Sequence, residues 1–124
     1  MCGLPHWVEI SITRTDGPSY QVTLEGRTLT YQQWMSEAPR QTEQLHPAPR
    51  EWREFLSALE AVDIRQWDSE YPAATPDPAV RWYIELAAPG YLLNTSGADV
   101  YPPGEAFPRF CEAMRALLGG REFG

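Results

Sequence analysis

The sequence predicts an α+β domain in which an antiparallel sheet of about five to six strands carries two helices on one face. Three observations favour this class. Two stretches have apolar residues at helical spacing, several others alternate apolar and polar residues as strands do, and Gly or Pro separates them. The 124 residues, 43% of them hydrophobic, are enough for a single domain, residues 1–124, with one core.

The first third of the chain is predicted to form three strands and a loop. Residues 8–13 alternate apolar and polar side chains, which is typical of a half-buried strand. Residues 20–25 repeat the alternation after turn-forming residues at 16–19, and residues 28–34 are rich in strand-favouring side chains. The polar stretch 35–48 contains two prolines, so we expect a loop there.

A helix is predicted from Pro49 to about residue 63, because proline suits the first turn of a helix. Its apolar face consists of Trp52, Phe55, Leu56, Leu59 and Val62. A second helix is predicted from about Glu105 to Leu118, with Gly119 and Gly120 as its stop. The same spacing recurs in its apolar face, which consists of Phe107, Phe110, Cys111, Met114, Leu117 and Leu118. Residues 121–124 are expected to fray.

Between the two helices the pattern predicts three more strands. Residues 64–71 are expected to hold a short strand, and residues 72–79 form an exposed connection with three prolines. Residues 80–86 show the clearest alternation in the chain, and residues 91–95 pair back onto them through a turn at 89–90. The predicted order is therefore β-β-β-α-β-β-β-α.

Composition and charge restrict the function. The formal net charge is −7, and all ten basic residues are Arg. Without Lys the chain has no Schiff-base chemistry and no phosphate loop of the kind that ends in Lys. Without a basic run it is not expected to bind nucleic acid, whereas a basic protein is a suitable partner for an acidic surface. The first nine residues lack the apolar segment of a signal peptide and no run could span a membrane, so a cytoplasmic bacterial protein is expected.

Two groups of residues between the helices are candidates for a binding site. Asp63, Asp68 and Glu70 form the densest acidic group, which could seat an acid–base pair or a hard cation, although a solvated strand edge explains it more simply. Four aromatic residues follow one another closely: Trp67, Tyr71, Trp82 and Tyr83. Such side chains could bind a flat ligand or anchor a protein partner.

Strand alternation divides this group. Trp82 is in register with apolar neighbours and is expected in the core, whereas Tyr83 projects to the opposite face beside Arg81 and Glu85. The candidate binding residues are therefore Trp67, Asp68, Glu70, Tyr71, Arg81 and Tyr83. Neither a catalytic triad nor a metal-binding motif is found, and Cys2 and Cys111 cannot supply a zinc shell, so no catalytic residue, metal or cofactor is assigned.

The part of the chain from Trp52 onward resembles a pattern in small bacterial α+β proteins of unknown function. The residues that carry the resemblance are Trp67 and Tyr71, the strand with Trp82, Ile84 and Leu86, then Gly97, Tyr101-Pro102, and Phe107 with Phe110. The resemblance implies the fold but no activity. Where this pattern would have an Asp-Gly turn before Trp82, the chain has Asp77-Pro78-Ala79.

These observations favour a non-enzymatic, acidic protein-interaction module, such as an immunity-type or inhibitor-type protein that masks a basic partner. The alternative is a small-ligand binder or a hydrolase that uses Asp63, Asp68 or Glu70 near Trp67 and Tyr71. A third interpretation is a structural or regulatory role in a larger assembly, with a homodimer formed through an exposed sheet edge.

Overall fold

The chain is described by a computed structural model over residues 5–15, 17–35, 38–88, 91–102 and 104–123. Within these ranges it forms seven strands, two α-helices and one short 3-10 helix. In chain order these are β1 (Trp7–Arg14), β2 (Pro18–Glu25), β3 (Thr28–Met35), β4 (Ala38–Leu45), α1 (Pro49–Ala61), η1 (Ile64–Gln66), β5 (Glu70–Tyr71), β6 (Val80–Ala88), β7 (Tyr91–Ala98) and α2 (Ala106–Leu117).

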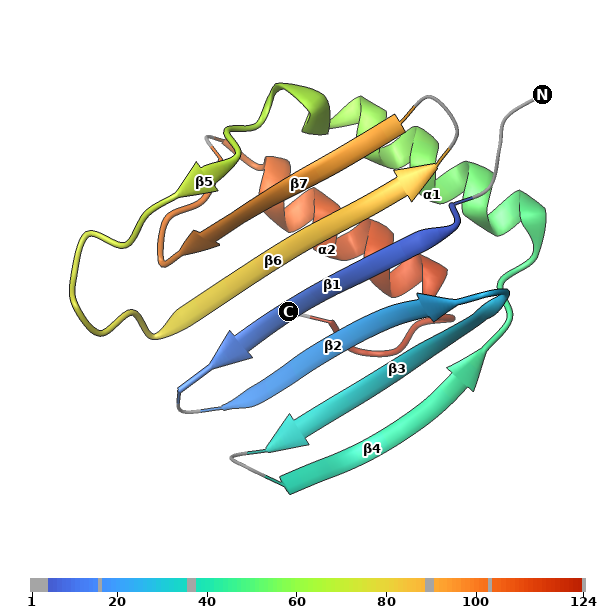
Figure 1. The fold of residues 1–124 in the computed structure, drawn as a ribbon, viewed down its shortest axis with the longest axis horizontal. Coiled ribbons are helices and arrows are strands. Elements are labelled where there is room, and N and C mark those ends of the chain that lie inside the picture. The colour runs from blue at the N-terminus through green and yellow to red at the C-terminus, as the bar shows by residue number, and fades with distance from the viewer. Residues whose placement is uncertain (1–4, 16, 36–37, 89–90, 103, 124) are drawn as a thin grey trace.

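The described strands form one sheet in the order β4-β3-β2-β1-β6-β7-β5. Neighbouring strands are antiparallel except β5 and β7, which are parallel. The first strand lies at the centre of the sheet between β2 and β6, so residues far apart in the sequence meet there (Figure 1). Ile10, for example, is paired with Val22 on one side and with Ile84 on the other.

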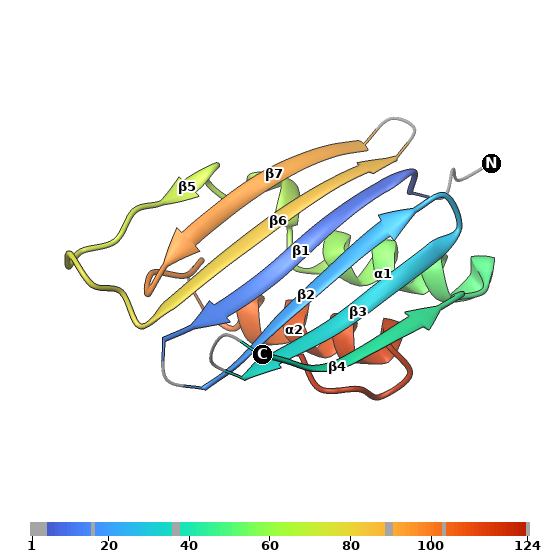
Figure 2. The ribbon, with the colours of Figure 1, turned by 60° about the horizontal axis from the view of Figure 1, so that its bottom comes forward.

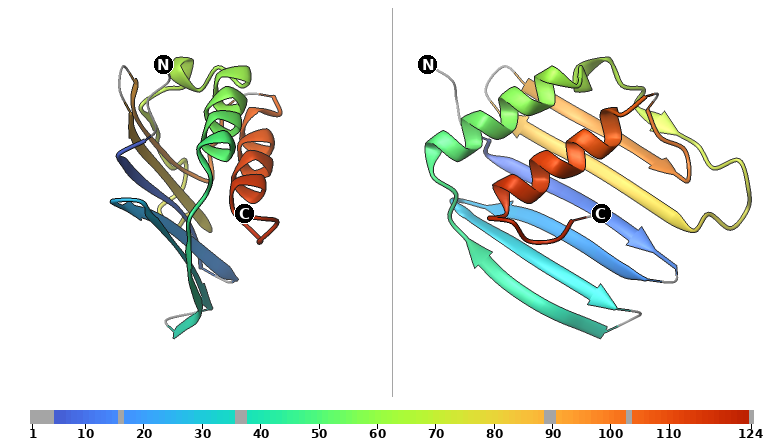
Figure 3. Two further views of the ribbon diagram at one scale, coloured as in Figure 1. Left: turned by 90° about the vertical axis from the view of Figure 1, so that its right-hand side faces the viewer. Right: turned by 180° about the vertical axis from the view of Figure 1, so that it is seen from behind.

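Both α-helices lie on one face of the sheet, as the sequence predicts, and the class is α+β (Figures 2 and 3). No helix of the described ranges covers the opposite face, which is called the open face below. Strand alternation gives the open face polar side chains in its central strands, including Glu9, Ser11, Gln21, Thr23, Glu85 and Asn94.

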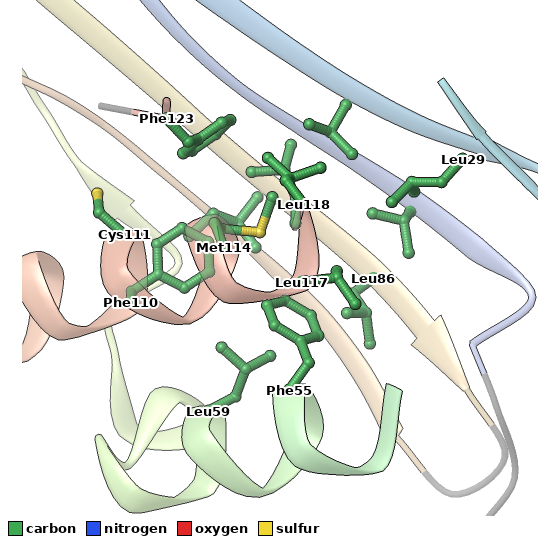
Figure 4. Close-up of a cluster of buried hydrophobic side chains, with 14 of the residues drawn as sticks. Leu29, Phe55, Leu59, Leu86, Phe110, Cys111, Met114, Leu117, Leu118 and Phe123 are labelled. Atoms are coloured by element: carbon green, nitrogen blue, oxygen red, sulfur yellow. The ribbon is translucent and has the colours of Figure 1, made fainter. Parts of the chain in front are cut away.

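The core lies between the sheet and the helices. Val8, Ile10 and Ile12 of β1 are at most 2% exposed, because alternate residues of this strand point at the helices. Trp52, Phe55 and Leu59 supply the buried face of α1. Figure 4 shows the second helix presenting Phe110, Met114 and Leu117 to this core. The helical spacing found in the sequence therefore identifies the packed faces correctly, including the buried Cys111.

The first helix begins where the sequence predicts. Pro49 occupies its first turn, and the Glu51 carboxylate accepts the Ala48 N–H at 2.9 Å. At the N-terminal end of the helix, a backbone donor is therefore satisfied by a nearby side chain. The negative charge of Glu51 is also favourable there, because this end of the helix dipole is positive.

The prediction of a loop over residues 35–48 is wrong, because Ala38–Leu45 forms β4. This edge strand pairs with β3, with Leu29 opposite Leu45 and an irregularity at Gln33 and Trp34. Its exposed side chains are polar, so no apolar alternation marks it in the sequence. Backbone hydrogen bonds to β3, not burial, account for its formation. The sheet therefore has seven strands in the described ranges where five to six were expected.

Residues 64–71 form less strand than predicted. Ile64–Gln66 is a 3-10 helix with Ile64 buried in the core, and only Glu70–Tyr71 pairs with the sheet. Asp63, just before this turn, adopts a left-handed conformation with φ of 52°. The chain thereby leaves α1 and reaches the far edge of the sheet in a few residues.

The expectation that residues 121–124 fray is wrong for those that are described. Phe123 is 1% exposed and its ring lies 5.8 Å from that of Tyr20. Arg121 donates two hydrogen bonds to the Glu43 carboxylate, at 2.8 and 2.9 Å, and the Tyr31 hydroxyl donates to the Glu122 carbonyl at 2.7 Å. The C-terminal segment therefore contacts β2, β3 and β4 through Tyr20, Tyr31 and Glu43. It follows directly on the second helix, on the helix side of the sheet (Figure 3).

Candidate functional site

The six candidate residues lie on two sides of the sheet. Trp67 and Tyr71 are half-buried on the helix side, and Asp68 and Glu70 near them are exposed. Arg81 and Tyr83 lie on the open face, because they alternate with the buried Trp82 and Ile84. The structure therefore does not bring the six into one site.

On the helix side, Trp67 and Tyr71 belong to an aromatic cluster around Trp82. The Trp82 ring lies 5.7 Å from the Tyr71 ring and 6.2 Å from the Trp67 ring. Phe107 packs against Trp82 at 5.0 Å. The Trp67 indole N–H donates to the Val62 carbonyl at 3.1 Å, and the Trp82 indole N–H donates to Val100 at 3.0 Å. These contacts give both tryptophans a structural role, so the prediction that Trp82 is in the core is confirmed.

A cavity of about 530 Å³ adjoins this cluster. Its walls include Asp63, Trp67, Tyr71 and Arg109 from the connection after α1 and from α2. Asp68 and Glu70 are not among the described residues of its lining. Of the three carboxylates in the hydrolase hypothesis, only Asp63 reaches the cavity, and each of the three residues is exposed. The geometry therefore separates the carboxylates that the hypothesis would combine.

On the open face, Glu85 is the centre of a hydrogen-bonded group. Its carboxylate accepts the Trp7 indole N–H at 2.6 Å, the Tyr83 hydroxyl at 2.5 Å and the Asn94 side-chain amide at 3.3 Å. The register places Glu9 directly opposite Glu85 on the neighbouring strand. Two carboxylates thus lie side by side on the central strands, on the open face of the sheet.

Apolar side chains border this group. Ala87 of β6 is paired with Trp7 on one side and with Leu92 on the other. Trp7 is 43% exposed and Leu92 is 84% exposed, so this row offers apolar surface beside the two carboxylates. The Glu85 patch below means these residues together: Trp7, Glu9, Tyr83, Glu85, Leu92 and Asn94.

The electrostatics of the patch follow from its two carboxylates. The pKa of Tyr83 is raised, first because its hydroxyl donates to Glu85 and then through partial burial and the charges of Glu85 and Glu9. The phenol therefore stays a neutral donor. Like charges directly opposite each other on adjacent strands are unfavourable. Three hydrogen-bond donors partly compensate for this repulsion at Glu85. A cation placed between Glu9 and Glu85 would be attracted by both carboxylates.

Sequence reasoning named Tyr83 as a candidate binding residue and placed Glu85 beside it, but it missed Trp7, Glu9, Leu92 and Asn94. The alternation in residues 80–86 already places Glu85 on the same face as Tyr83. The alternation does not reveal that β1 pairs with β6. This pairing brings Trp7 and Glu9 next to Glu85, although they are far apart in the sequence. Strand pairing at this sequence separation has no local signal.

No group of three or more potential metal ligands occurs within the described ranges, and no helix there is long and apolar enough to cross a membrane. Comparisons with protein-family models, curated proteins and solved structures find no match for this chain. Function is therefore inferred from the geometry of this chain alone.

Proposed function

We propose that this chain is a non-enzymatic protein-interaction module that docks onto a basic protein through the Glu85 patch on the open face of its sheet. The observation that carries the proposal is the pair of opposed carboxylates, Glu9 and Glu85, on a sheet face that no described helix covers. A partner's Arg or Lys placed between them would relieve their mutual repulsion.

The surroundings of the pair also suit a protein partner. Trp7 and Tyr83 are residue types that dominate binding energy at interfaces, and here their polar atoms are already held by Glu85. Leu92, 84% exposed at the edge of the patch, would lose its contact with water on docking. The net charge of −7 would increase the rate of encounter with a basic protein at low salt.

Masking of a basic partner, as immunity-type and inhibitor-type proteins do, is the specific form of this proposal. Such a role needs a preformed surface and no chemistry. The three hydrogen bonds on Glu85 supply the preformed surface, because they fix the carboxylate before a partner arrives.

The test is affinity capture from the native host with the full chain as bait. The expected result is a basic protein that is retained at low salt and released as salt rises. The double variant Glu9→Gln/Glu85→Gln and the single variant Leu92→Ser should each lose it. The matched control, Glu54→Gln/Glu112→Gln, removes the same number of charges from exposed sites on α1 and α2 and should still capture it.

Three results would contradict the proposal. One is a captured protein that is not basic, and another is capture that survives both open-face variants. The third is loss of capture in the control as well, because overall charge would then explain binding without the patch. Sedimentation of the pure chain as a dimer that Leu92→Ser dissociates would favour a second copy of this chain as the occupant instead.

A further inference from the structure

A second cavity, of about 420 Å³, lies on the helix side of the sheet, between α2 and the ends of β1 and β6. Its walls are mainly apolar and come from Ile12, Val80, Pro102, Phe107 and Pro108. Two guanidinium side chains, Arg14 and Arg115, also line it. The cavity is within the size range of small-molecule sites, which combine apolar walls with a few charged or polar groups.

Arg115 has an unusual environment for a charged side chain. It lies near the end of α2, and its Nη1 atom is buried without a hydrogen-bond partner among the described residues. Arg115 also forms no ion pair with a carboxylate of the described ranges. A buried guanidinium nitrogen without an acceptor is unfavourable. Because Nη1 itself has almost no exposed surface, an anion in the adjoining cavity becomes its acceptor only when the Arg115 side chain turns towards the cavity.

Arg14 approaches the same cavity from β1. One of its guanidinium N–H groups donates to the Pro18 carbonyl at 3.1 Å, and the guanidinium carbon lies 6.0 Å from the centre of the Tyr20 ring. Like Arg115, it forms no ion pair within the described part of the chain. Because a guanidinium has five N–H donors, Arg14 keeps donors for a further acceptor.

The other polar groups of the lining are neutral. The pKa of the Cys111 thiol is raised to about 11 by burial, although the charges of Arg115 and Arg14 lower it in part. The pKa of Tyr101 is raised by burial and then by the charge of Asp99. Asp99 is itself engaged, since its carboxylate accepts the N–H groups of Ala79 and Val80 at 2.7 and 3.0 Å. At neutral pH the described lining thus carries two positive charges and no negative one.

We propose that this cavity binds a small organic monocarboxylate with an apolar aromatic or aliphatic body. The carboxylate would accept hydrogen bonds from Arg115 and Arg14, and the body would lie against Phe107, Ile12 and Val80. Arg pairs with a carboxylate through two parallel hydrogen bonds, and the apolar walls favour an anion with a carbon body over a fully hydrated ion such as phosphate. This site is on the covered side of the sheet and does not depend on the proposed docking of a protein.

Isothermal titration calorimetry on the full chain tests the proposal, with phenylacetate and hexanoate as probes. At least one of them should bind at one site per chain. Phenylacetamide, which has the same shape without the charge, and inorganic phosphate, which has the charge without the apolar body, should bind far more weakly. Failure of both carboxylates to bind, or equal binding of phenylacetamide or phosphate, would overturn the assignment.

Variants then locate the site. Arg115→Met keeps the apolar part of the side chain and removes the unpartnered nitrogen, so it should fold at least as well as the original chain. It should weaken carboxylate binding by about tenfold to hundredfold, since hydrogen bonds to charged groups are among the strongest in proteins. Arg14→Met should weaken binding as well.

The matched control is Arg109→Met, which removes an exposed Arg of the same helix that pairs with Glu105 at 3.7 Å. It should leave carboxylate binding unchanged. Nitrogen-15 spectra of the arginine side chains provide a direct readout, because the Arg115 signals should shift on addition of phenylacetate while those of Arg109 stay in place. Unchanged binding in Arg115→Met, or an unmoved Arg115 signal, would overturn the site.

Discussion

Gly97→Ala should be among the most destabilising single changes in the sheet, although it adds one methyl group. Gly97 lies in β7 opposite Trp82, on the helix side. A Cβ atom at this position would lie 2.5 Å from Trp82 Nε1 and 2.6 Å from its Cε2 and Cζ2 atoms. Ordinary contacts between such atoms are about 3.5–4.0 Å, so the ring or the strand must move by about 1 Å.

The Trp82 ring cannot move away without losing other contacts. Phe107 and Tyr71 pack against it, with ring centres 5.0 and 5.7 Å away, and its indole N–H donates to Val100. Overpacking of this kind costs about 1–3 kcal/mol, and loss of the indole hydrogen bond adds about 1 kcal/mol. We therefore expect Gly97→Ala to lower the free energy of unfolding by about 2–4 kcal/mol, and Tm by about 10 °C.

Urea denaturation followed by tryptophan fluorescence measures this loss. The control is Gly17→Ala, because a Cβ there would lie 3.5 Å from Arg14 Cδ, an ordinary contact, so the change should stay within about 0.5 kcal/mol. In a Trp82→Phe background the ring is smaller, so the loss of unfolding free energy caused by Gly97→Ala should be smaller by about 1 kcal/mol or more. A Gly97→Ala chain as stable as the original, or strictly additive effects in the double variant, would refute the steric explanation.

Two further predictions concern titrating groups. Hydrogen bonds from Arg121 hold the pKa of Glu43 below its ordinary value of 4.5. The pair therefore stabilises the fold fully above pH 4.5, and this contribution is lost as the pH falls through the lower pKa of the folded state. Glu43→Gln should thus be less stable than the original chain at pH 7 and equal to it at pH 2 in urea titrations; a constant difference would contradict this. The pKa of Cys111 is raised from 9.0 to about 11, so at pH 8 its thiolate fraction is about 100-fold smaller than in the unfolded chain. Iodoacetamide should modify Cys111 at least that much more slowly in the native protein than in guanidinium, as measured by peptide mass spectrometry, and equal rates would show that the thiol is accessible.

The sequence predicts those elements that are stabilised by burying an apolar face of their own. The alternation around Ile10 and Ile84 and the helical spacing around Phe55 and Met114 identify the central strands and both helices, because each element buries one face of its own pattern. Gly97 has no side chain and so contributes nothing to such a pattern. The sequence names it only through the resemblance, and the structure gives it a packing role against Trp82.

The elements that were missed depend on other parts of the chain. The edge strand β4 has polar exposed side chains and forms by pairing with β3, so it carries no pattern of its own. Phe123 packs against Tyr20, and the ion pair of Arg121 with Glu43 holds the same segment to β4. No local rule near the C-terminus predicts these contacts. The Glu85 patch likewise requires the register between β1 and β6.

Strand β1 contributes residues to both proposed sites, on opposite faces of the sheet. Its alternation sends Glu9 to the open face and sends Ile12 and Arg14 to the cavity under the sheet. Among the charged residues of β1 itself, Glu9 thus lies on one face of the sheet and Arg14 on the other. An acidic chain can in this way keep two arginines for an anion without neutralising the surface offered to a basic protein. Each proposal therefore stands or fails by its own variants, Glu9→Gln/Glu85→Gln for the partner and Arg115→Met for the carboxylate.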